Sequence, residues 1–541
     1  MLSGRQLLIL ARSGVLAPGR PDAIVFQVAA LGAWGLGLAG ELRQAAARSP
    51  GTIAVIDERR GAVTYAALLD GADRAAGVLR ALGLEPGERL GVLCRNHLLL
   101  VEVLAAAGAL GADVVLLNTG LVPSQIGATC TEHELSLIVH DDEFATTVEE
   151  SGVARGGRTG VLAESDLLHG MAEAVRPRLS PPPRTGRAIV LTSGTTGTPR
   201  GARRPAPRGI GDLASMLDRI PLRVGDTVLL SAPIFHTWGL AGLQLSLALR
   251  STIVLQRTFQ PAAARSALRV QGCHVMYAVP AMLQRMLALR QERSVTDPVG
   301  ADGGERLRVV AVSGSALPAG LARSFTAAYG PVLHNVYGST EVSWATVADP
   351  RDLARAPGTA GRPPVGTAVV VLGADGSPAP EGQTGRIFVG NDMVFDGYTS
   401  GPQKEVWRGL VATGDLGHVE DGLLFVDGRE DDLVISGGEN VHAGEVEDVV
   451  TRMPGVREAA VFGVEDAEFG QRLVAYVVPE DDDLRPEDVL GHLASRVARH
   501  GRPREVVIVD ALPRNETGKV LLRVLRDRHG KGLPADRREG P

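Results

Sequence analysis

Short apolar segments alternate with helical segments along much of the chain, and this alternation limits the possible fold more than any other feature. Residues 90–94, 113–117 and 136–140 are apolar runs typical of buried strands. Between such runs the apolar residues recur at helical spacing, for example where Thr64 can cap a helix that ends at Gly83. Strands that alternate with helices predict an α/β fold with doubly wound, mainly parallel sheets.

The same pattern continues downstream and suggests how the chain divides into domains. Further strands are predicted at 188–191, 227–231, 252–255, 274–278, 308–312 and 332–336. Between 345 and 426 glycines and prolines separate shorter runs, which predicts a small antiparallel β subdomain. Because 541 residues exceed one compact core, we expect a large N-terminal domain (1–428), a smaller mobile α+β C-terminal domain (429–526) and a disordered tail (527–541).

Composition narrows the functional classes and the cellular location. A net charge of −6 gives no support for nucleic-acid binding, so no nucleic-acid partner is expected. Cys94, Cys130 and Cys273 lie in mainly apolar segments without metal spacing, as expected for core thiols of a reduced protein. The N-terminus lacks the pattern of a secretory signal. We therefore expect a cytoplasmic protein.

Residues 23–40 are uncharged and mostly apolar, which raises the question of membrane contact. The segment is at the lower length limit for a span and contains four glycines. A packed helix or a membrane-surface helix is favoured over a span. The second alternative predicts loose contact with the inner face of the membrane.

A loop rich in Gly and Thr, residues 192–201, follows the apolar run 188–191. Its glycines let backbone N–H groups point inward and its hydroxyls add donors, so the loop is suited to holding phosphate. The spacing is not that of a Walker A loop. Taken alone, the loop could also be a surface turn, although a phosphate site is favoured. The arginines in 200–208 could form a solvated face or attract an anion.

Further motifs follow the loop in a fixed order. They are 233–240 (PIFHTWGL), 312–317 (VSGSAL), 337–341 (YGSTE), 413–416 (TGDL), 428–432 (GREDD), 436–440 (SGGEN) and 512–519 (LPRNETGK). In this order and spacing the chain resembles, from about residue 45 to 525, the adenylate-forming superfamily of acyl-CoA synthetases, luciferases and adenylation domains. The resemblance is greatest to bacterial fatty acyl-CoA synthetases.

The resemblance implies a two-step ligation that uses ATP, Mg²⁺ and coenzyme A. A small-molecule carboxylic acid attacks the α-phosphate of ATP to give an acyl-adenylate and pyrophosphate, and the CoA thiol then displaces AMP. The dense donors and a divalent cation neutralise the charge of two anions in one site. Two alternatives remain: an acyl-AMP ligase that loads an acyl carrier protein, and a catalytically silent binding protein.

Residue roles are carried over from the resemblance by matching motifs. The nucleotide-binding residues would be Thr192, Ser193, Gly194, Thr195, Thr196, Gly197, Arg200, Gly314, Ser315, Tyr337, Gly338, Asp415, Arg429, Gly437 and Gly438. Among these, Asp415 and Arg429 would bind the ribose, Tyr337 would stack near the adenine, and Gly437 and Gly438 would let the pantetheine arm pass.

Three catalytic residues and a hinge complete the set that the resemblance implies. Thr340 would contact the α-phosphate, Glu341 would hold Mg²⁺, and Lys519 would bridge the carboxylate and the α-phosphate. Asp431 would be the hinge about which the C-terminal domain rotates between the two steps. Arg200 departs from the family, which usually has lysine at this position, so its phosphate contacts are in doubt.

The segment after His236 indicates the substrate class. Residues 234–248 contain no carboxylate for an amino-acid substrate, whereas Trp238, Gly239, Leu240 and Val336 would form an apolar wall. These residues favour a fatty or other apolar acid. His236, a fourth catalytic candidate, either gates the entrance or packs in the core.

Overall fold

The computed structural model describes residues 2–156, 159–192, 200–207, 209–292, 306–430, 433–436, 439–466, 470–480, 483–494, 496–497, 501–514 and 520–530. The chain forms two compact units. One consists of Met1–Val369 with Val389–Val411, and the other of Val370–Phe388 with Ala412–Pro541. Each unit is described by itself.

An eight-stranded sheet in the first unit has the order β14-β13-β12-β11-β9-β10-β1-β2. Its strands are β1 (Ile53–Asp57), β2 (Gly61–Thr64), β9 (Thr227–Leu230), β10 (Thr252–Leu255), β11 (Val275–Ala278), β12 (Val309–Val312), β13 (Leu333–Tyr337) and β14 (Thr346–Ala348). The six central strands are parallel, and β2 and β14 pair antiparallel at the two edges. This confirms the mainly parallel sheet predicted from the alternating pattern.

A six-stranded sheet in the same unit has the order β6-β5-β3-β4-β7-β8. Its strands are β3 (Arg89–Leu93), β4 (Asp113–Leu116), β5 (Leu137–His140), β6 (Gly160–Ala163), β7 (Ala188–Thr192) and β8 (Arg200–Arg204). All neighbours are parallel except β8, which returns antiparallel to β7. The first part of the arginine-rich stretch that follows the predicted phosphate loop therefore forms the edge strand β8.

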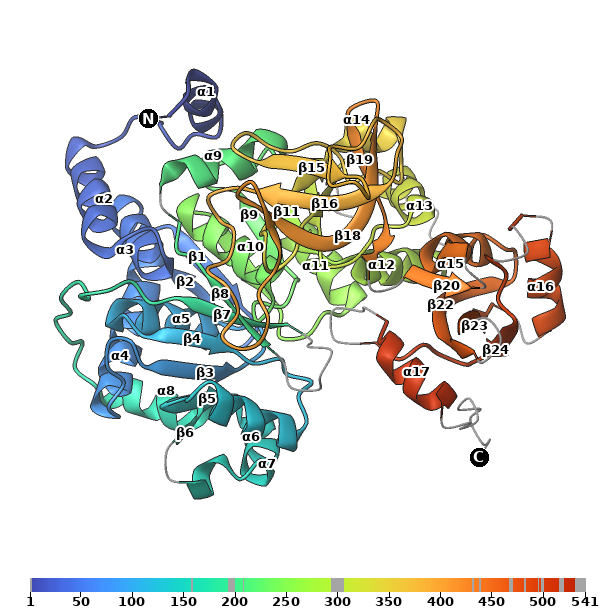
Figure 1. Ribbon diagram of the computed structural model, residues 1–541. Coiled ribbons are helices and arrows are strands. Elements are labelled where there is room, and N and C mark those ends of the chain that lie inside the picture. Colours follow the sequence, from blue (N-terminus) through green and yellow to red (C-terminus); the bar gives the residue numbers. More distant parts are fainter. Residues whose placement is uncertain are drawn as a thin grey trace. The chain divides into compact units, whose positions relative to one another are not determined.

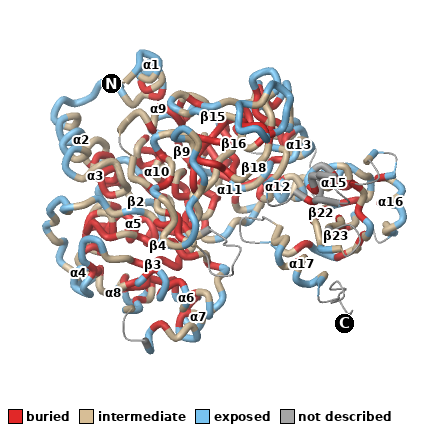
Figure 2. Tube along the Cα trace, viewed as in Figure 1, coloured by how far each residue is buried: buried red, intermediate tan, exposed pale blue. Residues whose placement is uncertain are grey.

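Helices cover both sheets of the first unit, and Figure 2 shows the buried residues concentrated in the sheets and the helices against them. The α-helices of this unit are α1 (Gly4–Arg12), α2 (Pro21–Trp34), α3 (Leu38–Arg48), α4 (Tyr65–Ala81), α5 (Leu98–Leu110), α6 (Pro123–Glu132), α7 (Ala145–Glu150), α8 (Glu164–Glu173), α9 (Ile210–Arg219), α10 (Thr237–Ala248), α11 (Pro261–Val270), α12 (Pro280–Glu292), α13 (Ala319–Tyr329) and α14 (Pro350–Arg355). Short 3₁₀ turns occupy Asp142–Phe144 and Val153–Gly156. As predicted, the Thr64 side chain caps α4 by accepting a hydrogen bond from the Ala67 N–H.

The apolar segment 23–40 is not one helix, contrary to the prediction. Gly35 adopts φ +75°, a left-handed conformation that glycine tolerates, so α2 ends there and α3 begins at Leu38. The two helices differ in burial, since α3 buries much of its length and α2 buries no residue. Among the described residues no helix combines the length and the apolar character needed to cross a membrane.

Two further sheets follow (Figure 1). The first contains β15 (Ala368–Leu372), β16 (Gly385–Gly390), β17 (Val406–Trp407), β18 (Leu410–Glu420) and β19 (Leu423–Arg429). The second, in the C-terminal α+β part, contains β20 (Leu433–Ser436), β21 (Glu439–His442), β22 (Val456–Asp466), β23 (Gly470–Pro479) and β24 (Glu505–Ile508) with helices α15 (Ala443–Thr451), α16 (Pro486–Ala494) and α17 (Leu522–Gly530). Residues 527–530 are thus helical rather than part of a disordered tail, and 531–541 lie outside the described residues.

Candidate active site

A tight turn after β13 holds the two most important predicted residues, Thr340 and Glu341. The Ser339 hydroxyl accepts hydrogen bonds from the N–H groups of Glu341 (3.2 Å) and Val342 (3.4 Å), which fixes the turn. A Cβ at Gly338 would lie only 2.0 Å from the carbonyl oxygen of Ser343. Gly338, predicted to bind the nucleotide, is thus required by the close approach of two backbone segments.

The Glu341 side chain is buried, with 8% of the residue exposed. Its Oε1 accepts a 2.5 Å hydrogen bond from the Tyr398 hydroxyl. Its backbone carbonyl accepts a second hydrogen bond, 2.7 Å long, from the Phe395 N–H. The segment that contains Phe395 and Tyr398 therefore holds both the backbone and the carboxylate of Glu341.

Arg204, the last residue of β8, brings a buried positive charge to the same turn. One guanidinium nitrogen donates to the carbonyl oxygen of Thr340 (3.3 Å) and another to the Ser343 hydroxyl (2.9 Å). Burial lowers the pKa of Arg204 to about 10, against the opposing effect of the Glu341 charge. Arg204 therefore remains a cation at neutral pH, close to the predicted contact of the α-phosphate.

The PIFHTWGL motif reaches this turn through its threonine. The Thr237 hydroxyl donates to the Thr340 hydroxyl across 3.1 Å. Thr237 is the first residue of α10, and Thr340 follows β13, so two motifs more than a hundred residues apart are in contact. The structure thus brings the predicted α-phosphate contact together with the start of the predicted acyl wall.

His236 precedes α10 and is neutral at physiological pH. Burial lowers its pKa to about 4. Its Nε2 atom is buried without a hydrogen-bond partner among the described residues, and its ring lies 4.6 Å from that of Phe235. A buried, unpartnered nitrogen is costly, so this atom is suited to a ligand or a water molecule.

The predicted acyl-wall residues are packed in the core of the first unit. The Trp238 indole N–H donates to the carbonyl oxygen of Ala278 (3.1 Å), and its ring lies 5.2 Å from that of Tyr277. Leu240 and Val336 are also buried. A Cβ at Gly239 would lie 2.1 Å from the Pro233 carbonyl, so glycine is required where α10 begins.

Other predicted nucleotide contacts lie at the carboxyl ends of parallel strands, where ligands bind in open α/β sheets. Gly314 and Ser315 follow β12, and Gly314 adopts φ +96°. Tyr337 ends β13 and is partly exposed. Thr192 ends β7 and pairs with Arg200 at the start of β8, so these two residues flank the predicted phosphate loop.

In the second unit, Asp415 and Arg429 occupy directly opposed positions on β18 and β19. The Arg429 Nε lies 3.7 Å from an Asp415 carboxylate oxygen. The Asp415 N–H donates to the Thr413 hydroxyl across 3.0 Å. The two predicted ribose contacts are therefore neighbours.

Nine predicted site residues lie outside the described residues. They are the loop positions Ser193, Gly194, Thr195, Thr196 and Gly197, the hinge Asp431, and Gly437, Gly438 and Lys519.

Three residues near Thr340 and Glu341 were not predicted from the sequence: Arg204, Thr237 and Tyr398. The first two lie within the arginine-rich segment and the PIFHTWGL motif. Tyr398 lies in no motif, and its partner Glu341 is 57 residues away. Its role becomes visible only in the folded chain.

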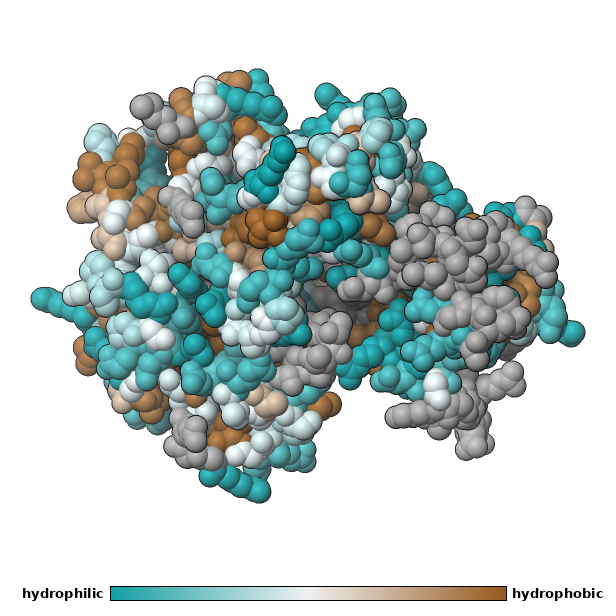
Figure 3. Space-filling view, viewed as in Figure 1, coloured by the Kyte–Doolittle hydropathy of each residue, from teal (hydrophilic) through white to brown (hydrophobic). Residues whose placement is uncertain are grey.

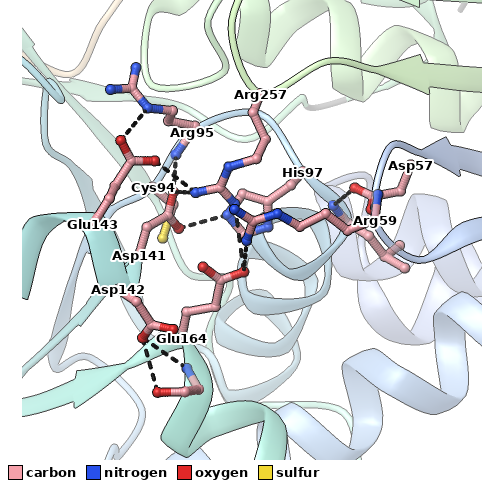
Figure 4. A network of polar contacts seen from close by, with 12 residues as sticks. Asp57, Arg59, Cys94, Arg95, His97, Asp141, Asp142, Glu143, Glu164 and Arg257 are labelled. Carbon is pink, nitrogen blue, oxygen red and sulfur yellow. Dashed lines mark hydrogen bonds and ion pairs between the residues drawn. The ribbon is translucent and has the colours of Figure 1, made fainter.

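A second polar cluster, also missed, joins the two large sheets of the first unit (Figure 4). Cys94, His97 and Asp141 have possible ligand atoms within 4.8 Å of one another. However, both Asp141 oxygens are already engaged, one by His97 (2.7 Å) and the other by Arg257 (2.7 Å) and the Arg95 N–H (3.0 Å). Burial raises the pKa of the Cys94 thiol well above its usual value. Since Arg257 supplies the positive charge and the thiol stays protonated, the cluster is better suited to holding the sheets together than to binding a metal.

Comparisons with family profiles and with known proteins point to the same family. The profile of the family described as AMP-binding enzyme matches residues 42–399, and that of the AMP-binding enzyme C-terminal domain matches residues 445–519. The chain is 28% identical to the long-chain-fatty-acid–CoA ligase FadD13 of Mycobacterium tuberculosis (91% of this chain, 98% of the relative). It is 33% identical to a feruloyl-CoA synthase of Amycolatopsis (87% and 94%) and 32% identical to the fatty acid–[acyl-carrier-protein] ligase ScoC of Streptomyces coeruleorubidus (89% and 94%).

Solved structures agree with these sequence matches. The crystal structure of ATP-bound MatB from Rhodopseudomonas palustris superimposes with a TM-score of 0.81 at 28% identity, covering 91% of this chain and 99% of that one. The fold predicted from the sequence is thereby confirmed.

Proposed function

Because the chain belongs to the AMP-binding family of adenylate-forming enzymes, we propose that it converts a fatty or other apolar carboxylic acid to its CoA thioester at the expense of ATP. A carboxylate oxygen of the acid attacks the α-phosphorus, the bond from that phosphorus to the bridging oxygen breaks, and pyrophosphate leaves. The thiolate of CoA then attacks the acyl carbon, and AMP leaves with the pair of electrons of the broken C–O bond.

The observation that carries this proposal is the turn around Thr340. Buried Arg204 donates to its carbonyl oxygen, and Thr237 donates to its hydroxyl. Fixed donors and a buried cation at the carboxyl ends of parallel strands favour a developing negative charge without reorganisation. We assign the α-phosphate to this turn, with the 192–200 loop for the departing pyrophosphate.

Glu341 fits the role of a magnesium ligand. Mg²⁺ prefers oxygen ligands such as carboxylates. One Glu341 oxygen, Oε1, accepts the hydrogen bond from Tyr398, and the other oxygen would ligate the metal. When bound, Mg²⁺ would supply positive charge to the phosphate oxygens. Asp415 and Arg429 are proposed for the ribose, and Tyr337 for the adenine.

The change from the adenylation step to the thioester step is proposed to depend on Lys519 and the C-terminal part. In the adenylation step Lys519 would neutralise charge between the acid and the α-phosphate. Rotation about Asp431 would then replace it with the Gly437–Gly438 loop, where CoA enters. Lys519→Ala should therefore block pyrophosphate release far more than thioester formation from preformed acyl-adenylate, and equal loss in both steps would contradict this role.

The choice of an apolar acid is supported by the residues of the predicted acyl wall and by the neutral His236. Trp238, Leu240 and Val336 are buried apolar side chains, and His236 is uncharged. The alternative acceptor, an acyl carrier protein, is supported by the similarity to ScoC. We favour CoA, because no long insertion separates Asp415 from Glu447 as is typical of the acyl-AMP ligases. Free buried thiols are consistent with the proposed cytoplasmic location.

A panel of acids tests the proposal. Purified protein is given ATP and Mg²⁺ with aliphatic, aromatic or dicarboxylic acids, and pyrophosphate and AMP are followed with and without CoA. AMP release that CoA stimulates, greatest with aliphatic acids, is the expected result. Product with a holo-carrier protein alone would favour the alternative acceptor, and folded protein that gives no acid-dependent pyrophosphate would refute both.

We further assign helix α2 to an anionic membrane surface. None of its residues is buried, and Val25, Phe26 and Val28 are 64%, 62% and 64% exposed. Figure 3 shows the corresponding apolar surface over α2. Three arginines and one aspartate precede residue 41, a net charge of +2 in a chain whose net charge is −6. Apolar contact together with basic residues is the combination that favours anionic lipid.

Sedimentation with phosphatidylglycerol vesicles tests this contact. Val25→Glu should abolish sedimentation, whereas Val175→Glu, a control at an 89% exposed valine outside α2, should not. Equal sedimentation of the two variants, or self-association of the protein through α2 without lipid binding, would contradict the assignment.

A further inference from the structure

Tyr398 makes the hydrogen bond that the structure gives to the Glu341 carboxylate. The phenolic O–H donates to Glu341 Oε1 across 2.5 Å, a short distance typical of a hydroxyl bound to a charged oxygen. The terminal torsion of a glutamate side chain is broad, so the orientation of its carboxylate depends on its hydrogen-bond partners. We propose that Tyr398 is a positioning residue: it fixes one oxygen of Glu341 and so leaves the other oriented to ligate the divalent cation that accompanies ATP. This inference rests on the proposed function, in which Glu341 binds Mg²⁺.

The backbone around Tyr398 is anchored well enough to position another side chain. We call residues 395–401 the clasp. The Phe395 N–H donates to the Glu341 carbonyl, which ties the clasp to the backbone of that residue. The Phe395 ring lies 5.0 Å from the Tyr398 ring in an edge-on arrangement, which restricts the phenol. A backbone hydrogen bond and a contact between two rings therefore both restrict the position of Tyr398.

The clasp also pairs with β8, the strand that leaves the predicted phosphate loop. Tyr398 forms an antiparallel bridge with Ala202. On one side the Arg203 N–H donates to the Gly397 carbonyl (3.1 Å), and on the other the Thr399 N–H donates to the Gly201 carbonyl (2.8 Å). Consequently one segment holds both the exit of the phosphate loop and the proposed metal ligand.

Arg200 acquires a structural explanation from the same segment. Its guanidinium lies against the backbone of Gly401, where a Cβ would be 3.2 Å from Arg200 Cζ. Gly401 adopts φ +75°, which glycine allows. A planar guanidinium stacks on such a flat surface better than an ammonium does. Arg200 thus joins the loop exit to the clasp, in addition to any phosphate contact.

A purely structural role for Tyr398 makes a different prediction from a positioning role. If the phenol only stabilised the fold, its loss would lower stability equally with and without Mg²⁺. If it orients Glu341, its loss weakens the response to Mg²⁺ and leaves binding of metal-free ATP unchanged. The two roles are therefore separated by a metal titration.

The test follows the unfolding temperature of Tyr398→Phe, which removes a single oxygen atom. Each protein is measured with ATP and EDTA, and then with saturating ATP and increasing MgCl₂. We expect Tyr398→Phe to require about tenfold more Mg²⁺ than the wild type to reach half of the metal-dependent increase in unfolding temperature, because it loses a hydrogen bond to a charged group. The increase caused by ATP in EDTA should be the same. Tyr329→Phe, on α13 and stacked on Phe325, is the matched control and should behave as wild type.

A double substitution completes the test. In a Glu341→Gln background, adding Tyr398→Phe should change the Mg²⁺ response no further, since the carboxylate that Tyr398 would position for the metal is already lost. An unchanged Mg²⁺ requirement in Tyr398→Phe, or an equal loss with ATP in EDTA, would overturn the positioning role. So would a wild-type protein without any Mg²⁺-dependent increase. Wild-type protein that responds to Mg²⁺ yet releases no pyrophosphate would refute the proposed reaction while supporting the role of Tyr398.

Discussion

Two buried carboxylates of the first unit, Asp141 and Glu341, differ in how the fold treats their charge. Asp141 accepts hydrogen bonds from His97, Arg257 and the Arg95 N–H. Burial alone would raise its pKa, but these donors outweigh burial and hold the pKa below its usual value. Glu341 receives a hydrogen bond from the neutral Tyr398, and the nearby cation Arg204 donates to Thr340 and Ser343 instead.

The difference is the one expected between a structural charge and the functional charge that we propose at Glu341. At Asp141 the charge is neutralised within the protein, so little is left for a ligand. At Glu341 the carboxylate is held by a neutral hydroxyl, and no cation among the described residues forms an ion pair with it, as expected for the proposed metal ligand. Burial alone would not have distinguished the two residues, since both are buried. The distribution of their partners does.

The largest expected effect is on catalysis at Glu341. Glu341→Gln should lower acid-dependent pyrophosphate release about 1000-fold, as for loss of a central electrostatic group. The free energy of unfolding should change little, because the amide keeps the contact with Tyr398. Steady-state rates and thermal unfolding of the same sample measure both quantities. A strongly destabilised variant with normal activity per folded molecule would place Glu341 with the structural carboxylates.

Asp141→Asn should give the opposite result. Removing the charge leaves Arg257 without one of its partners, and unfolding should become easier by about 3 kcal/mol. The rate per folded molecule should be unchanged. Chemical denaturation measures the loss, with Asp142→Asn, a neighbouring exposed aspartate, as the control. Full stability combined with lost activity would reverse the assignment of the two carboxylates.

His236 should show a smaller, pH-dependent effect. Its pKa falls from about 6.5 to about 4 on folding, so the unfolded chain binds more protons between these values. Wild-type stability should therefore rise with pH from 4 to 6.5, and His236→Gln should reduce this slope by about 1 kcal/mol per pH unit at most. His334, whose pKa is also lowered to about 4, offers the comparison, because His334→Gln should reduce the slope without affecting activity. An unchanged slope in His236→Gln would mean that the imidazole is not held neutral.

The smallest effect is expected at Arg200. Arg200→Lys keeps the charge but loses the flat contact with Gly401, so activity should fall by no more than about threefold. The KM for ATP measures this directly. Loss of nearly all activity would show that the guanidinium, not only its charge, binds the phosphates.

Much of the fold could be predicted from the sequence, because parallel strands buried on both faces read as continuous apolar runs. The prediction failed where local sequence and tertiary partners disagree. The arginines of 200–204 (RGARR) are compatible with a solvated face, but these residues form β8, and Arg204 is buried with hydrogen-bond partners at residues 340 and 343. Segment 23–40 suggests one helix because its apolar character hides the break at Gly35.

The same reason explains what could and could not be predicted of the site. Thr340 and Glu341 lie in a contiguous motif, so the sequence alone was enough to propose them. Tyr398 and the Asp141 cluster depend on contacts between residues far apart in the chain, which no local pattern records. Positions that hold other residues in place are therefore the ones that only the structure reveals.

The central claim, that the turn at Thr340 and Glu341 serves adenylate formation, is tested most directly by acid-dependent exchange of labelled pyrophosphate into ATP without CoA. The account predicts exchange with an aliphatic acid in the wild type and in Asp141→Asn corrected for its folded fraction, and about 1000-fold less in Glu341→Gln. Exchange that survives in Glu341→Gln, or that is absent from folded wild-type protein with every acid, would contradict it.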